Sequence, residues 1–254
     1  MKIFDSLVHP TLSGKANKHG ISTSFDEIDG ALKKLSIEKI LAIGMPEPDY
    51  THLKFFNECS KYSRFVPVAA LTCSSEPEIE IKEIKEIGYK AIKIHPRSLK
   101  GKLDKDQLLK TLLSSEAHGL KVLLCTYCYS DIRDQYHLSL LDMLDVISRT
   151  PPSLKIMLVH GGVFDLLKVL EISKYTENVL VDLSFTLMKY SGTSLDLDII
   201  YALNNFDRKI CVGSDFPDFT LENFERRIIS LSNNLPLEKK ENILFKNLEK
   251  FMDL

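Results

Sequence analysis

The sequence lacks any long hydrophobic run. No apolar stretch among its 254 residues approaches the roughly 18–20 needed to cross a bilayer, which argues against a membrane partner. The opening residues Met1–Asp5 reach an acidic side chain almost at once, which is not typical of a signal peptide. The five cysteines show no framework spacing and therefore indicate reduced thiols. We expect a cytoplasmic protein.

Neither sign of charge is in clear excess, because 33 Lys and Arg residues are set against 35 Asp and Glu residues, for a net charge of −2. Nucleic-acid-binding domains usually carry a basic surface, so we expect no nucleic-acid partner. The sequence leaves two oligomeric states open, a monomer and a homo-oligomer. Hydrophobic residues make up 44% and charged residues 27% of the chain, which is enough for a large core.

Short apolar, β-branched runs alternate with amphipathic stretches along the whole chain. Eight runs are expected as strands: Lys2–His9, Lys39–Met45, Phe65–Leu71, Ala91–His95, Lys121–Thr126, Lys155–His160, Val179–Phe185 and Lys209–Ser214. Nine stretches are expected as helices: Phe25–Leu35, Tyr50–Tyr62, Glu76–Ile87, Asp104–His118, Tyr136–Ser148, Val163–Lys174, Leu195–Asn205, Leu221–Leu231 and, at the C-terminus, Leu237–Met252.

This alternation predicts an α/β protein with buried parallel strands, since both faces of such strands are covered by helices. Eight βα units in about 250 residues fit a closed barrel better than an open doubly wound sheet. The G-x-G-x-x-G turn that often marks the open sheet is also missing after the first expected strand. We therefore predict one domain over residues 1–254, a (β/α)8 TIM barrel with an extra C-terminal helix.

Polar residues gather where the expected strands end. Strand interiors favour apolar side chains, and the active sites of such barrels lie at the C-terminal ends of the strands. Five of the eight expected strands end in residues that can carry chemistry: His9, then Lys93 with His95 and Arg97, then Cys125, His160 and Asp215. Their convergence at one mouth predicts a functional site.

Five segments resemble, in order and spacing, the amidohydrolase-related branch of the amidohydrolase superfamily. They are Phe4–His9, which is similar to D-x-H-x-H, Ala91–Pro96, Lys155–Gly162, Val179–Ser184 and Val212–Pro217, which is similar to G-S-D-x-P. The resemblance implies a TIM-barrel hydrolase with a divalent metal. It also implies metal ligands at two strand-one histidines, a strand-five histidine and a strand-eight aspartate.

The chain departs from that pattern at two ligand positions, where Leu7 replaces the first histidine and Cys125 replaces the strand-five histidine. Zinc accepts His, Asp and Cys, and a catalytic zinc needs three protein ligands and a water. We therefore expect zinc or another divalent metal, with zinc favoured by a thiolate ligand. The candidate ligands are His9, Cys125, His160 and Asp215.

Asp215 and His160 are also the candidate catalytic residues, because both can move a proton. The predicted substrate is a small anionic carbonyl compound such as a lactone or amide, although some relatives decarboxylate instead. A buried Lys93 needs an anion, which either the substrate or an internal Asp5 or Asp182 supplies. The candidate substrate-binding residues are Lys93, His95, Arg97 and Arg133.

Three further interpretations bear on the same residues. The loss of a ligand at Leu7 also fits a metal-independent, lactonase-like hydrolase, or a catalytically degenerate barrel that acts as a binding protein.

Cys125-x-x-Cys128 has the spacing of a redox pair, but such a pair belongs at a helix N-terminus in a different fold. Because side chains two residues apart on a strand face the same way, Asp5, Leu7 and His9 are expected to face the mouth together.

Overall fold

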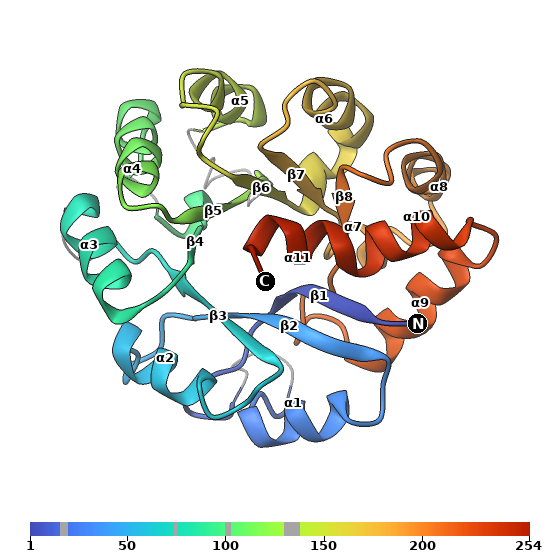
Figure 1. Cartoon of the computed structure of the whole chain (residues 1–254), viewed down its shortest axis with the longest axis horizontal. Coiled ribbons are helices and arrows are strands. Elements are labelled where there is room, and N and C mark those ends of the chain that lie inside the picture. The colour runs from blue at the N-terminus through green and yellow to red at the C-terminus, as the bar shows by residue number, and fades with distance from the viewer. Residues whose placement is uncertain (16–19, 74–75, 100–102, 130–137) are drawn as a thin grey trace.

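Eight parallel strands form a barrel surrounded by helices in the computed structural model, which describes residues 1–15, 20–73, 76–99, 103–129 and 138–254 (Figure 1). Each strand pairs with the next along the chain, as the predicted (β/α)8 TIM barrel requires. The strands are β1 (Ile3–Val8), β2 (Ile37–Ile43), β3 (Phe65–Ala70), β4 (Ala91–Ile94), β5 (Lys121–Cys125), β6 (Ile156–Val159), β7 (Val179–Asp182) and β8 (Ile210–Cys211).

The outer ring contains α1 (Phe25–Leu32), α2 (His52–Cys59), α3 (Pro77–Ile87), α4 (Lys105–Ala117), α5 (Leu140–Ser148), α6 (Leu166–Ser173), α8 (Leu195–Asn205) and α9 (Leu221–Ser232). A short helix that was not predicted, α7 (Thr186–Lys189), follows β7. The helix predicted from Tyr136 begins only at Leu140, where Ser139 caps it, and residues 136–137 lie outside the described residues. No described helix is long and apolar enough to cross a membrane.

An irregular segment after β8 closes the barrel against β1. The amide of Ser6 donates to the carbonyl of Val212 over 3.0 Å, and the amide of Asp215 donates to the carbonyl of Leu7 over 2.9 Å. The expected strand Lys209–Ser214 is therefore regular only over Ile210–Cys211. Asp215 itself has a φ of 57°, which ends the extended conformation and turns its carboxylate into the mouth.

Strand β1 carries a register shift against β2 between Asp5 and Val8. As a result Phe4 and Leu7, three residues apart, both belong to the buried cluster inside the barrel. The shift interrupts the alternation of side chains, so the expectation that Asp5, Leu7 and His9 share one face does not hold for Asp5. The Asp5 carboxylate instead accepts from the backbone amides of Leu7 and Ser214.

The C-terminal segment covers the N-terminal end of the barrel, as Figure 1 shows, and confirms the predicted extra helix. It comprises α10 (Leu237–Glu241), a π-helical turn over Asn242–Lys246 and α11 (Asn247–Met252). Leu248, Phe251 and Met252 join the cluster inside the barrel. Lys121, at the start of β5, pairs with Asp253 over 3.0 Å. One end of the barrel is thus closed, and the C-terminal ends of the strands are left for a site.

Candidate active site

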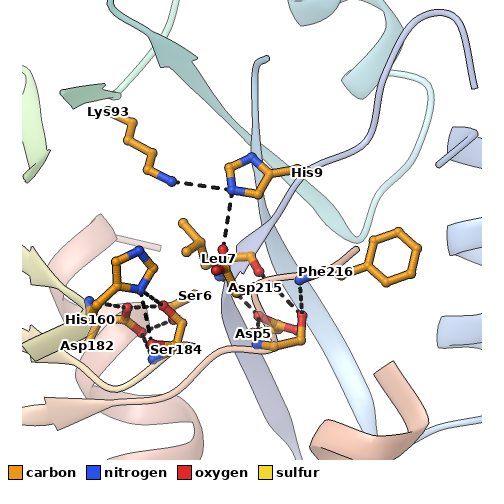
Figure 2. Close-up of polar contacts among 11 residues, drawn as sticks. Asp5, Ser6, Leu7, His9, Lys93, His160, Asp182, Ser184, Asp215 and Phe216 are labelled. Atoms are coloured by element: carbon orange, nitrogen blue, oxygen red, sulfur yellow. Dashed lines mark hydrogen bonds and ion pairs between the residues drawn. The ribbon is translucent and has the colours of Figure 1, made fainter. Parts of the chain in front are cut away.

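Three predicted site residues make direct contact at the mouth of the barrel (Figure 2). The Nζ atom of Lys93 lies 3.3 Å from Nε2 of His9. This Nε2 atom of His9 lies 3.5 Å from Oδ1 of Asp215. Lys93 is only 5% exposed. Neither Asp5 nor Asp182 pairs with Lys93, and within the described part of the chain it forms no ion pair with a carboxylate.

Burial and the charge of Lys93 lower the pKa of His9 below its ordinary value of 6.5, so its imidazole is neutral at pH 7. Burial opposes ionisation of Asp215, but the hydrogen bond from His9 and the charge of His160 hold the pKa of this carboxyl well below its usual range. The mouth therefore holds a permanent carboxylate, a neutral imidazole and an ammonium group side by side.

A second group of contacts holds His160 in place (Figure 2). The backbone amide of His160 donates to Oδ2 of Asp182 over 3.2 Å, and its ring Nδ1 lies 3.0 Å from the carbonyl oxygen of Ser184. Because a carbonyl only accepts, Nδ1 carries a proton, which fixes the tautomer of the neutral ring. Hydroxyls of Ser6 in β1 and of Ser184 also donate to Asp182, which fixes this carboxylate beside His160.

From this position the chain continues through four consecutive residues with positive φ, from His160 at 68° to Val163 at 56°. Such angles exclude a helix, which is why α6 begins at Leu166 rather than at the predicted Val163. A Cβ on Gly162 would lie 2.7 Å from Cγ2 of Val169, so only glycine fits there.

Cys125 lies at the end of β5, where it pairs in register with Val159, the residue before His160. Burial opposes its ionisation, but the charges of His95 and His160 bring the pKa of this thiol well below its usual 9.0. Burial lowers the pKa of His160, but the charge of the Cys125 thiolate outweighs this effect and raises that pKa to about 9. Each residue therefore favours the charged form of the other, the thiolate of Cys125 and the imidazolium of His160.

Replacing Cys125 by serine is expected to bring the pKa of His160 well below 9, because the charge that stabilises the imidazolium is removed and burial then dominates. Two-dimensional NMR of the imidazole C–H groups across pH 5–10 measures this pKa directly. Cys128→Ser is the matched control, because that half-buried thiol donates to the carbonyl of Thr126 instead. Equal His160 pKa values in the two variants would contradict the pairing.

Asp5 joins the two chain segments that carry His9 and Asp215. Its Oδ1 accepts from the amide of Leu7 over 3.0 Å and from the amide of Ser214 over 2.9 Å. A Cβ on Gly213 would come within 2.9 Å of the same oxygen, so the segments approach closely only because residue 213 is glycine. Burial raises the pKa of Asp5 to about 7.

Aromatic side chains that sequence reasoning missed line the mouth on the side of β5 to β8. The rings of Tyr127 and Phe185 lie 5.1 Å apart, and Phe185 lies 5.5 Å from the ring of His160. Arg97 stacks 4.7 Å above Tyr127 and donates to the carbonyl of Tyr129 over 3.0 Å. In the sequence, only the position of Phe185 at the end of the expected strand Val179–Phe185 indicated that an aromatic side chain would lie at the mouth.

The other predicted substrate-binding residues are placed less directly. Nδ1 of His95 accepts from the amide of Ser98 over 3.2 Å, so Nε2 is the ring nitrogen left for other partners. The charge of His95 also helps to lower the pKa of Cys125. Arg133 lies outside the described residues. Lys93 is thus the predicted cation that the structure brings into contact with His9 at the centre of the mouth.

The four predicted metal ligands do not converge on one point. Among the described residues, no group of three or more His, Cys, Asp or Glu side chains is placed to hold a metal ion. His9 faces Asp215, whereas Cys125 pairs with His160. The ammonium of Lys93 also lies next to the His9 nitrogen that faces Asp215. This arrangement does not fit a bound cation, because like charges repel.

A family model described as amidohydrolase matches residues 48–253. No curated protein matches the sequence significantly. An uncharacterised TIM-barrel protein from Bordetella bronchiseptica is 17% identical, with a TM-score of 0.82 over 100% of this chain and 99% of that one. The structure of a probable 2-pyrone-4,6-dicarboxylic acid hydrolase from Acinetobacter baumannii, with citric acid bound, is 15% identical (TM-score 0.70, 100% of both chains). A dihydroorotase from Campylobacter jejuni is also 15% identical (TM-score 0.66, 100% of this chain and 83% of that one). These similarities concern the fold.

Proposed function

Because the chain belongs to the amidohydrolase family and is a hydrolase of that type, we propose that it cleaves a small anionic lactone or related ester without a metal ion. The observation that carries this proposal is the contact of the Lys93 ammonium with His9, beside Asp215. A cation bound by His9 and Asp215 would have to displace that ammonium. The predicted zinc site of His9, Cys125, His160 and Asp215 is the competing arrangement.

The charge of the substrate follows from Lys93. A buried ammonium without a carboxylate partner is costly, and an anionic group of the substrate supplies the missing charge. The aromatic residues around Phe185 offer flat apolar surface beside His160. The Acinetobacter protein supports the choice, because its name refers to a cyclic ester with two carboxylates and its structure contains citric acid.

The proposed reaction uses two residues of opposite charge. The Asp215 carboxylate accepts a proton from water as the water oxygen adds to the carbonyl carbon of the lactone. The ring C–O bond then breaks, and the imidazolium of His160 gives its Nε2 proton to the leaving oxygen. The low pKa of Asp215 keeps it ionised, and the pKa of about 9 at His160 keeps that residue protonated at neutral pH.

The first test is dependence on metal. After dialysis against EDTA, elemental analysis should find far less than one metal ion per chain, and hydrolysis of 2-pyrone-4,6-dicarboxylate should proceed at an unchanged rate. His9→Ala should leave the metal content unaltered. The proposal fails if chelation abolishes the reaction and one zinc ion per chain restores it in the wild type but not in His9→Ala, a result that would instead support the zinc site.

A further inference from the structure

The helices on one side of the ring expose more large apolar side chains than the others. Leu197, Ile200 and Tyr201 project from α8, and Leu167 and Ile172 project from α6. By contrast, α2, α3, α4 and α9 expose one such residue each. Leu141 on α5, Phe164 before α6 and Tyr175 after α6 are exposed as well, and we call the outer side of these helices the α5–α8 face.

This face contains a groove and a ridge. The groove lies between α5 and α6, has a volume of about 260 Å³ and is lined mainly by Leu144, Ile147, Pro152, Val169, Ile172 and Thr176. The ridge is the stripe Leu197, Ile200 and Tyr201, whose spacing puts all three side chains on one side of α8. Helix α6 separates the two features, since α8 packs against it on the side away from α5 (Figure 1).

The charges on α6 suit contact with an identical surface. Asp165 pairs with Lys168 over 2.7 Å, and Glu171 pairs with Lys174, so the helix presents no net charge from these four residues. In a two-fold interface a surface meets its own copy, and an excess of one sign would repel itself. Neutralised pairs remove that obstacle.

We propose that the α5–α8 face is the interface of a two-fold symmetric homodimer, with an axis near α6. The ridge on α8 of each protomer inserts between α5 and α6 of its partner, so each of the two contacts is made twice, as an isologous interface requires. The eight exposed side chains, between 36% and 82% exposed, present on the order of 1,000 Å². That area is comparable to the roughly 800 Å² per partner of a specific interface.

Sedimentation velocity of the full chain, over about 1–100 μM, tests the proposal. The wild type should sediment as a dimer, and Leu197→Glu and Ile172→Glu should each shift it to the monomer, because each places a charge in the apolar contact. Ile79→Glu is the matched control, since Ile79 is 62% exposed on α3 and should leave the dimer intact. Circular dichroism should show the same fold in all four proteins.

Three results would overturn the proposal. The first is a wild type that remains monomeric at every concentration. The second is a dimer that survives both Leu197→Glu and Ile172→Glu. The third is a dimer that Ile79→Glu dissociates as effectively as they do.

Discussion

Asp215→Asn is expected to lower kcat for lactone hydrolysis by about 10²–10⁴-fold, the usual contribution of a positioned general base. The amide keeps the shape of the side chain but cannot accept the proton of the attacking water. The change leaves Lys93 in place, so KM for an anionic substrate should change little. Steady-state hydrolysis of 2-pyrone-4,6-dicarboxylate provides both constants.

Asp218→Asn is the matched control for this experiment, because Asp218 is exposed and lies three residues further along the same segment. It should retain nearly full activity, and thermal unfolding should show that both variants are folded. If Asp215→Asn hydrolyses the lactone as fast as Asp218→Asn, Asp215 is not the base and the proposed mechanism is wrong.

Lys93→Met is expected to weaken the binding of citrate by about 10–150-fold, which corresponds to the loss of one charge-assisted hydrogen bond of roughly 1.5–3 kcal/mol. The same change should raise the pKa of His9, because the charge of Lys93 is one cause of its lowered value. Isothermal titration calorimetry measures the first effect, and NMR titration of the imidazole measures the second without any substrate.

Lys39→Met is a suitable control, because Lys39 pairs with Glu249 of the C-terminal helix at the opposite end of the barrel. It should change neither citrate binding nor the His9 titration. Unaltered citrate binding in a folded Lys93→Met protein would remove the argument for an anionic substrate. An unaltered pKa of His9 would show that the contact between the two side chains does not persist in solution.

The barrel could be predicted from the sequence because its pattern is local. Apolar runs such as Ala91–His95 and Lys121–Thr126 fall between helices with clear ends, such as the one that stops at Gly88 with a φ of 114°. The mouth was predictable for the same reason. Strand order brings the ends of all parallel strands to one edge, so His9, Lys93 and Asp215 were expected together and are in contact.

The sequence could not determine how those side chains pair. The register shift in β1 turns Asp5 toward the amide of Ser214, and this depends on the fit between β1 and the segment that closes the barrel. The contact of Lys93 with His9, and the interaction of Cys125 with His160, depend on distances across the mouth that residue spacing does not encode. The relation of these residues to a metal therefore depends on the tertiary structure.

The sequence by itself determined the number and order of the strands and the chemical character of their ends, because hydrophobic periodicity and chain order specify these. Only the tertiary structure decided which polar groups form hydrogen bonds or interact through their charges, and which helices present the groove and ridge of the α5–α8 face. The physical reason is that electrostatic and packing energies change over a few ångströms. Such distances arise between segments far apart in the chain, as between His9 and Asp215.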